Sequence, residues 1–230
     1  MSTAISANSK GTTIKKSLVV FSYFVFLMDR YPRASNFFNE QREKSKAKTA
    51  KSYVAFLRGI NNIGSKTVKM DELKSIFEAT GFTNVKTVLT SGNIVFETTI
   101  TESSAIITKV GIQLEEKLGY KVNIILRTLD ELCLLIKTNP FRQIKITPRT
   151  KLFLTFLSEK PVSGFKLPYK SPGNDFIIIR ITGNEIYSVV NLLPNKRPYH
   201  IISFLEKEFG NKITNRNWNT ILKIVSASKK

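Results

Sequence analysis

The segment YVAFLRGINNIG, residues 53–64, is a short apolar stretch that ends abruptly in a polar loop with two glycines. Five consecutive apolar residues at 53–57 are typical of a central β-strand that is covered on both faces. After this segment the spacing of apolar residues becomes regular, whereas residues 1–52 show no matching period. We therefore predict that the fold is built around this strand, and that residues 1–52 lie outside the globular core.

Composition and charge limit the functions that the chain can have. The chain has 230 residues, of which 42% are hydrophobic, enough for one large domain or two small ones. Its formal net charge is +19; residues 1–52 hold ten Lys/Arg and three Asp/Glu, which leaves 26 and 14 for residues 53–230. A basic surface favours polyanions. Because the excess is mostly scattered lysine, we predict that nucleic acid binds only weakly.

The N-terminal extension contains one apolar run in an otherwise polar segment. Residues 1–16 are rich in Ser, Thr and Lys and are predicted to be disordered. Residues 18–28, LVVFSYFVFLM, form a run of eleven residues, whereas a membrane-spanning helix needs about 20. We predict no integral span. The run is interpreted as a peripheral membrane anchor, an uncleaved export-like segment or a non-native extension.

The cysteine content favours a reducing compartment. The single cysteine, Cys133, excludes an intrachain disulfide and suits a reducing environment. The predicted location is therefore the cytoplasm. Association with a membrane through residues 18–28 is the alternative.

Residues 53–126 alternate between strand-like and helix-like patterns. Apolar residues recur at helical spacing after Met70 and again after residues 101–104. Thr128 and Glu131 form a capping-box pair that predicts a third helix. The predicted strands are residues 53–57, 85–89, 94–97 and 122–126. The order β-α-β-β-α-β is the split-βαβ, or ferredoxin-like, pattern.

The remainder of the chain repeats this pattern in a degenerate form. Residues 161–172 are predicted to be an irregular or short helical crossover, a helix ends at Gly210, and residues 215–226 form a closing helix. The predicted strands are residues 152–157, 176–181 and 186–190. The predicted fold class is α+β, with tandem ferredoxin-like (split βαβ) halves and antiparallel sheets. The predicted divisions are residues 1–52 for a non-core N-terminal extension, 53–141 for the first half and 142–230 for the second half.

Five short motifs together indicate a family. They are LRGIN at 57–61, VKM at 68–70, TSGNIVF at 90–96, NPF at 139–141 and RNWNT at 216–220. On these motifs, residues 53–223 resemble the family catalogued as domain of unknown function 1697. The resemblance implies tandem ferredoxin-like α+β halves, in agreement with the spacing of apolar residues, and it implies no known activity.

The sequence departs from the family pattern at three places. Ile63 stands where the family loop usually has glycine, and Asn215 where it usually has a small or hydroxyl residue. Residues 191–200 lack the Gly and Ser-Lys that usually follow the tyrosine-containing strand. The resemblance therefore does not extend to these positions.

Several chemistries are excluded by the residues present. One cysteine and one histidine, His200, do not make a typical zinc site. The sequence has no phosphate-binding Walker loop and no dinucleotide fingerprint. We therefore predict no metal and no cofactor. Cys133 lies on a predicted helix and is interpreted as a packing residue.

Polar residues gather at one edge of the first predicted sheet. In a split-βαβ sheet the first and third strands are antiparallel neighbours, so the end of one lies beside the start of the other. A helix that starts near Met70 begins at the same edge. Free backbone N–H groups, a guanidinium and a helix N-terminus together suit an anion or a phosphate. The residues of this candidate site are Arg58, Gly59, Asn61, Lys69, Ser91, Gly92 and Asn93.

A structural explanation of the same residues competes with the binding site. Glycines serve tight turns, and asparagine side chains satisfy loop backbone. We favour the structural explanation for the hairpin at 90–93 and the binding site for Arg58. No acidic residue lies in either loop, so Arg58 is expected to be exposed and available, or to be held by loop carbonyls or by a carboxylate from elsewhere. A buried Arg58 that is paired within the protein would make the motif structural.

A second polar cluster flanks the only tryptophan. Trp218 has helical spacing with Leu222 and Val225, so it is expected in the core, with Arg216 and Asn219 beside it. Whether these residues approach the first cluster does not follow from the sequence.

The predicted function is that of a soluble module that binds a small anionic or phosphate-bearing ligand. One alternative is an enzyme that acts on such a ligand, with Arg58 as the electrostatic element and Asn61 or Asn93 orienting the substrate. The other alternative is a weak nucleic-acid-binding protein.

Overall fold

The first sheet is built around β1 (Lys51–Arg58). The computed structural model describes residues 49–60, 68–161, 164, 166–192 and 200–228, so the predictions for residues 1–48 lie outside the described residues. Strand β1 pairs antiparallel with β3 (Asn93–Thr98) and with β4 (Asn123–Thr128). The sheet order is β2-β3-β1-β4, with β2 (Thr83–Thr87) at one edge.

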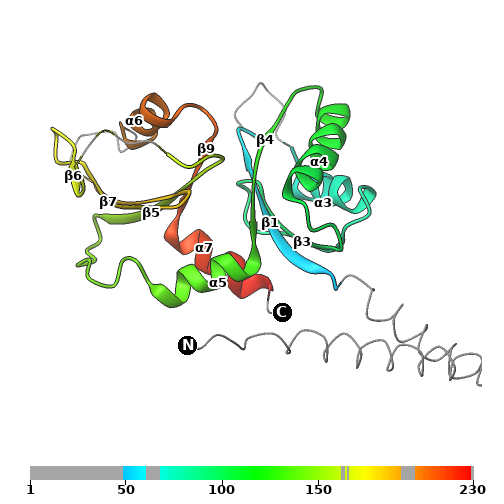
Figure 1. Ribbon diagram of the computed structural model, residues 1–230, viewed down its shortest axis with the longest axis horizontal. Helices are drawn as coiled ribbons and strands as arrows, with labels where there is room; N and C mark the ends of the chain where they lie inside the picture. Colours follow the sequence, from blue (N-terminus) through cyan, green and yellow to red (C-terminus); the bar gives the residue numbers. More distant parts are fainter. Residues whose placement is uncertain (1–48, 61–67, 162–163, 165, 193–199, 229–230) are drawn as a thin grey trace, which may run out of the picture. The chain divides into compact units, whose positions relative to one another are not determined.

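Strand β1 is buried on both faces, as its apolar sequence predicts. Tyr53, Ala55 and Leu57 pack under two helices, α3 (Met70–Ala79) and α4 (Ser103–Leu118), which cover one face of the sheet (Figure 1). The alternate residues Val54 and Phe56 belong to a second hydrophobic cluster on the opposite face. The alternation of side chains along a strand places the two sets in different cores.

The second sheet has five strands in the order β6-β7-β8-β5-β9. Helix α6 (His200–Phe209) covers its outer face through Ile201 and Leu205. The short strand β6 lies within the predicted crossover. The strands are β5 (Thr150–Leu157), β6 (Tyr169–Lys170), β7 (Phe176–Thr182), β8 (Glu185–Asn191) and β9 (Ile213–Asn217).

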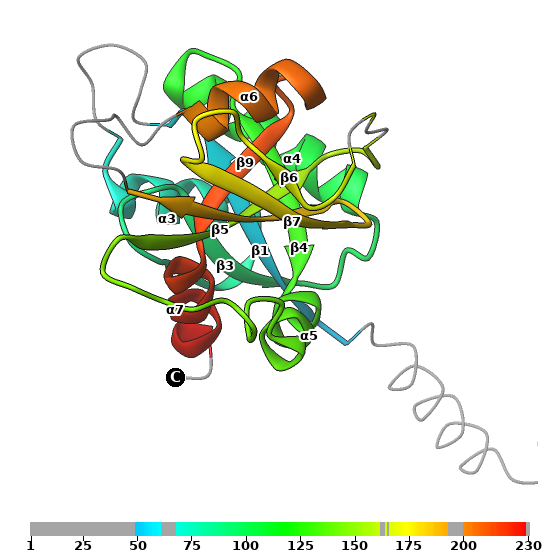
Figure 2. The ribbon, with the colours of Figure 1, turned by 90° about the vertical axis from the view of Figure 1, so that its left-hand side faces the viewer.

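The two sheets pack face to face. Side by side in Figure 1, they lie one in front of the other in Figure 2. Phe56 of the first sheet and Phe156 of the second stack with ring centroids 4.6 Å apart. Helices α5 (Leu129–Thr138) and α7 (Trp218–Ser228) lie at one end of this shared core. Trp218 is buried there, as predicted.

The predicted elements of the first half are confirmed with small shifts of their ends, including the capping box that opens α5. The protein is a mixed α+β protein with two antiparallel sheets. If β6 is set aside, the strands of the second sheet are arranged 2-3-1-4 by their order in the chain, as in the first sheet.

One element of the second half was predicted wrongly. Residues 213–217 form strand β9 and the last helix begins at Trp218, whereas we predicted a helix from residue 215. The sequence Ile-Thr-Asn-Arg-Asn has little strand character of its own. Its pairing with β5, from Phe153 to Leu157, makes it a strand. Within the described part of the chain, no helix is long and apolar enough to cross a membrane.

Candidate functional site

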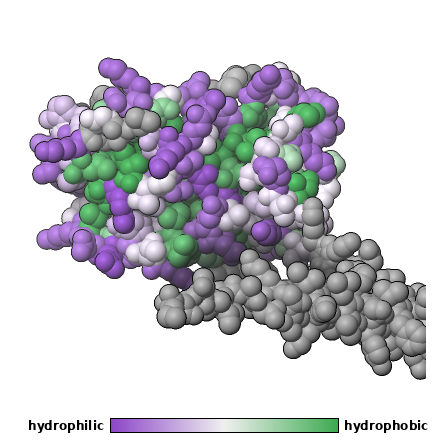
Figure 3. Space-filling view, in the orientation of Figure 1, coloured by the Kyte–Doolittle hydropathy of each residue, from purple (hydrophilic) through white to green (hydrophobic). Residues whose placement is uncertain are grey.

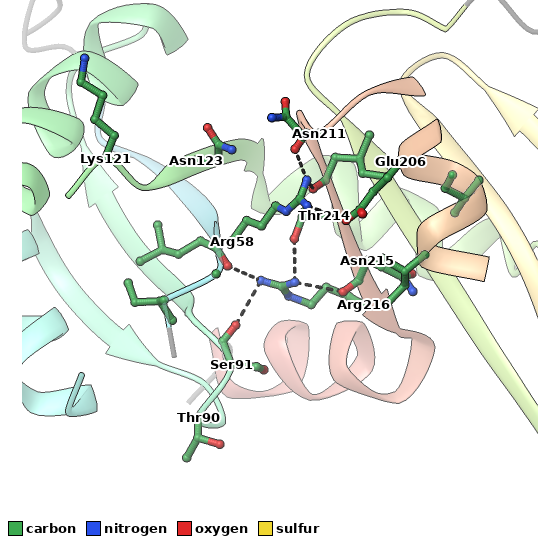
Figure 4. A pocket seen from close by; sticks show the side chains of 16 residues that line it. Arg58, Thr90, Ser91, Lys121, Asn123, Glu206, Asn211, Thr214, Asn215 and Arg216 are labelled. Atoms are coloured by element: carbon green, nitrogen blue, oxygen red, sulfur yellow. Dashed lines mark hydrogen bonds and ion pairs between the residues drawn. The ribbon is translucent and has the colours of Figure 1, made fainter. Parts of the chain in front are cut away.

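A cleft opens at the end of β1, where β9 and α6 of the second sheet approach it. Its volume is about 750 Å³. On the face shown in Figure 3, hydrophilic side chains gather along the junction of the two sheets. The polar residues that line the cleft are Arg58, Thr90, Ser91, Lys121, Asn123, Glu206, Asn211, Thr214, Asn215 and Arg216 (Figure 4).

Arg216 of β9 crosses from the second sheet to the first. Its Nε donates to Oδ1 of Asn93 at 2.6 Å, and its Nη2 donates to the carbonyl oxygens of Leu57 at 2.9 Å and Ser91 at 3.1 Å. Its Nη1 donates to Thr214 Oγ1 at 2.7 Å and to the carbonyl of Asn215 at 3.0 Å. All five N–H donors of the guanidinium are therefore used.

The charge of Arg216 is half-buried and has no acidic partner among the described residues. Every acceptor of its guanidinium is a carbonyl, a hydroxyl or an amide oxygen. Burial lowers the pKa of Arg216 to about 10, so the side chain stays protonated at neutral pH. The aromatic ring of Phe56, 5.5 Å from the guanidinium carbon, adds a cation–π contact. The wall of the cleft therefore carries an uncompensated positive charge.

Arg58 is paired, which is the second of the two arrangements expected for it: carbonyls and a carboxylate from elsewhere in the chain hold it. Its Nη2 lies 2.5 Å from Oε1 of Glu206, on α6. Its Nη1 donates to the carbonyls of Asn211 and of Ile213, the latter at 3.4 Å. The side chain is 29% exposed. Arg58 mainly connects the two sheets, because Glu206 balances its charge. The main uncompensated charge of the cleft belongs to Arg216.

A third arginine crosses in the opposite direction. Arg127 of β4 donates from Nε to Oε1 of Glu185 at 3.1 Å, and from Nη2 to the carbonyls of Leu157 at 3.2 Å and Asn184 at 3.4 Å. Its guanidinium carbon lies 5.1 Å from the ring centre of Phe156. Burial raises the pKa of Glu185 even though Arg127 opposes the shift. Here the buried arginine does have a carboxylate partner.

Arg127 and Arg216 occupy equivalent positions in the two sheets. Arg127 stands opposite Val54 in the pairing of β4 with β1, and Arg216 stands opposite Leu154 in the pairing of β9 with β5. Two residues beyond Val54 and Leu154 come the stacked rings of Phe56 and Phe156. Each arginine bonds the carbonyl of the leucine that follows the other sheet's phenylalanine.

Their Nε acceptors are equivalent as well. Asn93 of β3 pairs with Phe56, and Glu185 of β8 pairs with Phe156. The same register position thus holds an amide on the Arg216 side and a carboxylate on the Arg127 side.

Four of the predicted site residues line the cleft: Arg58, Gly59, Ser91 and Arg216. Asn93 is fully buried beneath it and holds Arg216. The sequence did not decide whether the two polar clusters meet. In the structure they meet through Arg216.

The other predicted residues lie elsewhere. Lys69 precedes α3 and Asn219 lies in the first turn of α7; both are exposed, and neither lines the cleft. Asn61 lies outside the described residues. Gly92 has φ +67°, and a Cβ there would lie 3.0 Å from Cβ of Leu57. The close packing of this turn supports the structural explanation of that glycine.

Other residues of the cleft were missed. Lys121 is exposed on the rim and extends away from Arg58 (Figure 4). Asn123 lies opposite Arg58 in the pairing of β1 with β4, so the predicted strand order could have located it. Glu206 and Asn211 lie in the other half of the chain, and no local pattern indicates that they reach Arg58.

The described residues offer no site for a metal. No group of three or more His, Cys, Asp or Glu side chains in that part of the chain is placed to hold an ion. Cys133 is half-buried and packs against the core between the sheets, as predicted. The side chain of His200 lies outside the described residues.

Comparisons with known proteins give a family and a fold. The model of the family described as "Protein of unknown function (DUF1697)" matches residues 50–187. Among curated proteins, none matches this chain. A conserved bacterial protein from Streptococcus pneumoniae has a similar structure, with a TM-score of 0.58 and 20% sequence identity over 77% of this chain and 98% of that chain. At this identity the likeness concerns the fold alone.

Proposed function

We propose that this chain, which belongs to the DUF1697 family of proteins of unknown function, binds a small anionic or phosphate-bearing ligand in the cleft between its two sheets. The observation that carries the proposal is the half-buried charge of Arg216, which no acidic residue among the described ones balances. A buried charge without a counter-ion is costly. A bound anion would supply the missing negative charge.

The composition of the cleft supports the same proposal. Arg58, Lys121 and Arg216 contribute three positive charges, and Glu206 contributes the one negative charge of the described lining. A volume of about 750 Å³ lies within the usual range for small-molecule sites, about 300–1,000 Å³. The hydroxyl of Ser91 accepts from Asn93 at 3.0 Å, and its own hydrogen can be donated to a ligand. Lys121 and Asn123 would provide further contacts at the rim.

We further propose that the two sheets are tandem ferredoxin-like halves, residues 53–141 and 142–230. The shared 2-3-1-4 arrangement of strands and the equivalent arginines support this interpretation. The second half is degenerate because the short strand β6 stands where the first half has α3. A site between two such halves is formed only when both are folded.

Calorimetric titration of the full chain with inorganic phosphate, pyrophosphate and a mononucleotide tests the proposed function. We expect saturable binding at one site that weakens as salt rises, because salt screens the attraction between charges. Lys121→Gln should weaken binding about threefold, since an exposed charge is worth about 0.2–1 kcal/mol. Lys117→Gln is the matched control, because Lys117 is equally exposed but does not line the cleft.

Two results would overturn the proposed function. The first is no binding of any of these anions near physiological salt. The second is equal weakening by Lys121→Gln and Lys117→Gln, which would show a general effect of surface charge. Binding of oligonucleotides without saturation by a mononucleotide would instead favour a nucleic-acid-binding surface.

A further inference from the structure

We infer that Asn93 is the residue that decides which of the two equivalent arginine sites accepts an anion. The inference rests on the proposed function. It names the residue that makes the Arg216 side of the molecule an anion site and leaves the Arg127 side without one. On the Arg216 side, the neutral amide of Asn93 leaves the arginine's charge available to a ligand. On the Arg127 side, the carboxylate of Glu185 neutralises the arginine within the protein.

The two positions differ in charge but not in the hydrogen bond that they make. Asn93 Oδ1 and Glu185 Oε1 each accept from the Nε of the arginine that crosses to them, at 2.6 Å and 3.1 Å. Both stand opposite the stacked phenylalanine in the central strand of their own sheet. An amide oxygen can orient a guanidinium as a carboxylate does, but it cannot balance the charge.

The amide of Asn93 is held in the orientation that this role needs. Its Nδ2 donates to the carbonyl of Val88 at 2.9 Å and to Oγ of Ser91 at 3.0 Å, so its oxygen faces Arg216. A carboxylate could not make either of these donated bonds. Local hydrogen bonding therefore selects the neutral side chain at this position, and the neutral side chain leaves the cleft basic.

The hollow on the Arg127 side is smaller as well as charge-balanced. Its volume is about 300 Å³, and Glu131 and Arg127 both line it. Ser158 follows Leu157 there, where Arg58 follows Leu57 in the cleft. The described lining of this hollow therefore has one arginine, Arg127, and one carboxylate, Glu131, and Arg127 is also paired with Glu185.

Titration of the full chain with pyrophosphate tests the inference through Asn93→Asp, with Glu185→Gln as the matched control. We expect Asn93→Asp to weaken binding tenfold or more, because a carboxylate close to Arg216 opposes an incoming anion by about 1.4 kcal/mol or more. Glu185→Gln changes one charge on the other side and should leave the affinity of the cleft unchanged. Equal affinity of the wild type and Asn93→Asp would overturn the inference.

A second variant tests the inference if the first does not fold. If Asn93→Asp does not fold, Ser91→Asp places a carboxylate at the exposed mouth of the cleft, beside the carbonyl that Arg216 bonds, and should weaken binding in the same way. Unchanged affinity of Ser91→Asp would then count against the inference.

A carboxylate titration separates the inference from the proposed function. If the wild type binds no pyrophosphate, the proposed function fails, and an NMR titration of the carboxyl that Asn93→Asp introduces tests separately whether a charge at this position couples to Arg216. Coupling to Arg216 should depress the pKa of that carboxyl below the ordinary aspartate range. An ordinary pKa would overturn the inference.

Discussion

The two crossings between the sheets, Arg216 on one side and Arg127 on the other, share a geometry and differ in charge. Each arginine spans to the other sheet, covers a stacked phenylalanine and bonds a leucine carbonyl. Of the two, Arg127 alone has a carboxylate acceptor among the described residues. The hydrogen bonds are common to both crossings and the ion pair is present at one of them, so we expect the packing of the two sheets to depend on the hydrogen bonds more than on the ion pair.

The largest effect is expected from Arg216→Met, which removes one crossing. The carbonyls of Leu57 and Ser91 and the side chain of Asn93 would lose their donor, and Asn93 is fully buried. We expect the free energy of unfolding to fall by about 3–5 kcal/mol, because several acceptors lose a hydrogen bond at once, each at about 1–3 kcal/mol where it stays buried. Urea unfolding measures it. A loss below about 1 kcal/mol, the net worth of a single hydrogen bond, would show that the sheets hold together without this crossing.

Arg127→Met should cost less, about 2–3 kcal/mol, because the carboxylate left behind can take up a proton. Burial already raises the pKa of Glu185, and loss of Arg127 raises it further. The folded state then binds a proton that the unfolded state has released, so stability falls as pH rises from the unfolded pKa toward the raised folded pKa and recovers at acidic pH. Arg216→Met leaves no orphan carboxylate and should show no such recovery. Unfolding of both variants at about pH 4 and about pH 7, on either side of the ordinary glutamate range, compares them.

Glu185→Gln sharpens the comparison by making the two acceptors alike. We expect a change in unfolding free energy within about 1 kcal/mol, because the amide oxygen of the new glutamine can still accept from Nε of Arg127, as that of Asn93 does from Arg216. The raised pKa of Glu185 means that it favours folding when protonated, so its contribution declines as pH rises from the unfolded pKa toward the folded one. The variant should lack this part of the pH dependence. A loss above about 3 kcal/mol would make the ion pair, rather than the hydrogen bonds, the essential feature.

The smallest effect is expected at the third crossing. Arg58 and Glu206 are 29% and 36% exposed, and ion pairs of this kind contribute about 0–1 kcal/mol. Glu206→Gln should therefore change the free energy of unfolding by about 0.5 kcal/mol. Thermal unfolding at matched pH measures it. A loss as large as that of Arg216→Met would place the main tie between the sheets at Arg58.

The first sheet could be predicted from the sequence because its signals are local. Five apolar residues at 53–57 indicate a strand that is buried on both faces, and Thr128 with Glu131 marks a helix start. The strand order then brings Ser91 to the end of β1, where it lines the cleft.

The charge balance of the cleft could not be predicted because it depends on distant contacts. Strand β9 has one apolar residue and becomes a strand by pairing with β5. Glu206 reaches Arg58 across 148 residues. The partners of Arg216 in the first sheet come from β1, from the turn before β3 and from β3 itself, and they meet it only when the sheets pack. Only the folded chain shows that Arg58 is neutralised and that Arg216 is not.

Arginine side-chain NMR is the direct test of anion binding beside Arg216 rather than Arg127. Pyrophosphate is titrated into the wild-type chain while the Nε–H resonances of Arg216 and Arg127 are followed, assigned by substitution of each. These residues sit in equivalent geometry, so each serves as the control for the other. We expect a saturable shift of the Arg216 Nε–H resonance and no shift of the Arg127 resonance. A shift of Arg127 with Arg216 unmoved, or no shift of either, would contradict it.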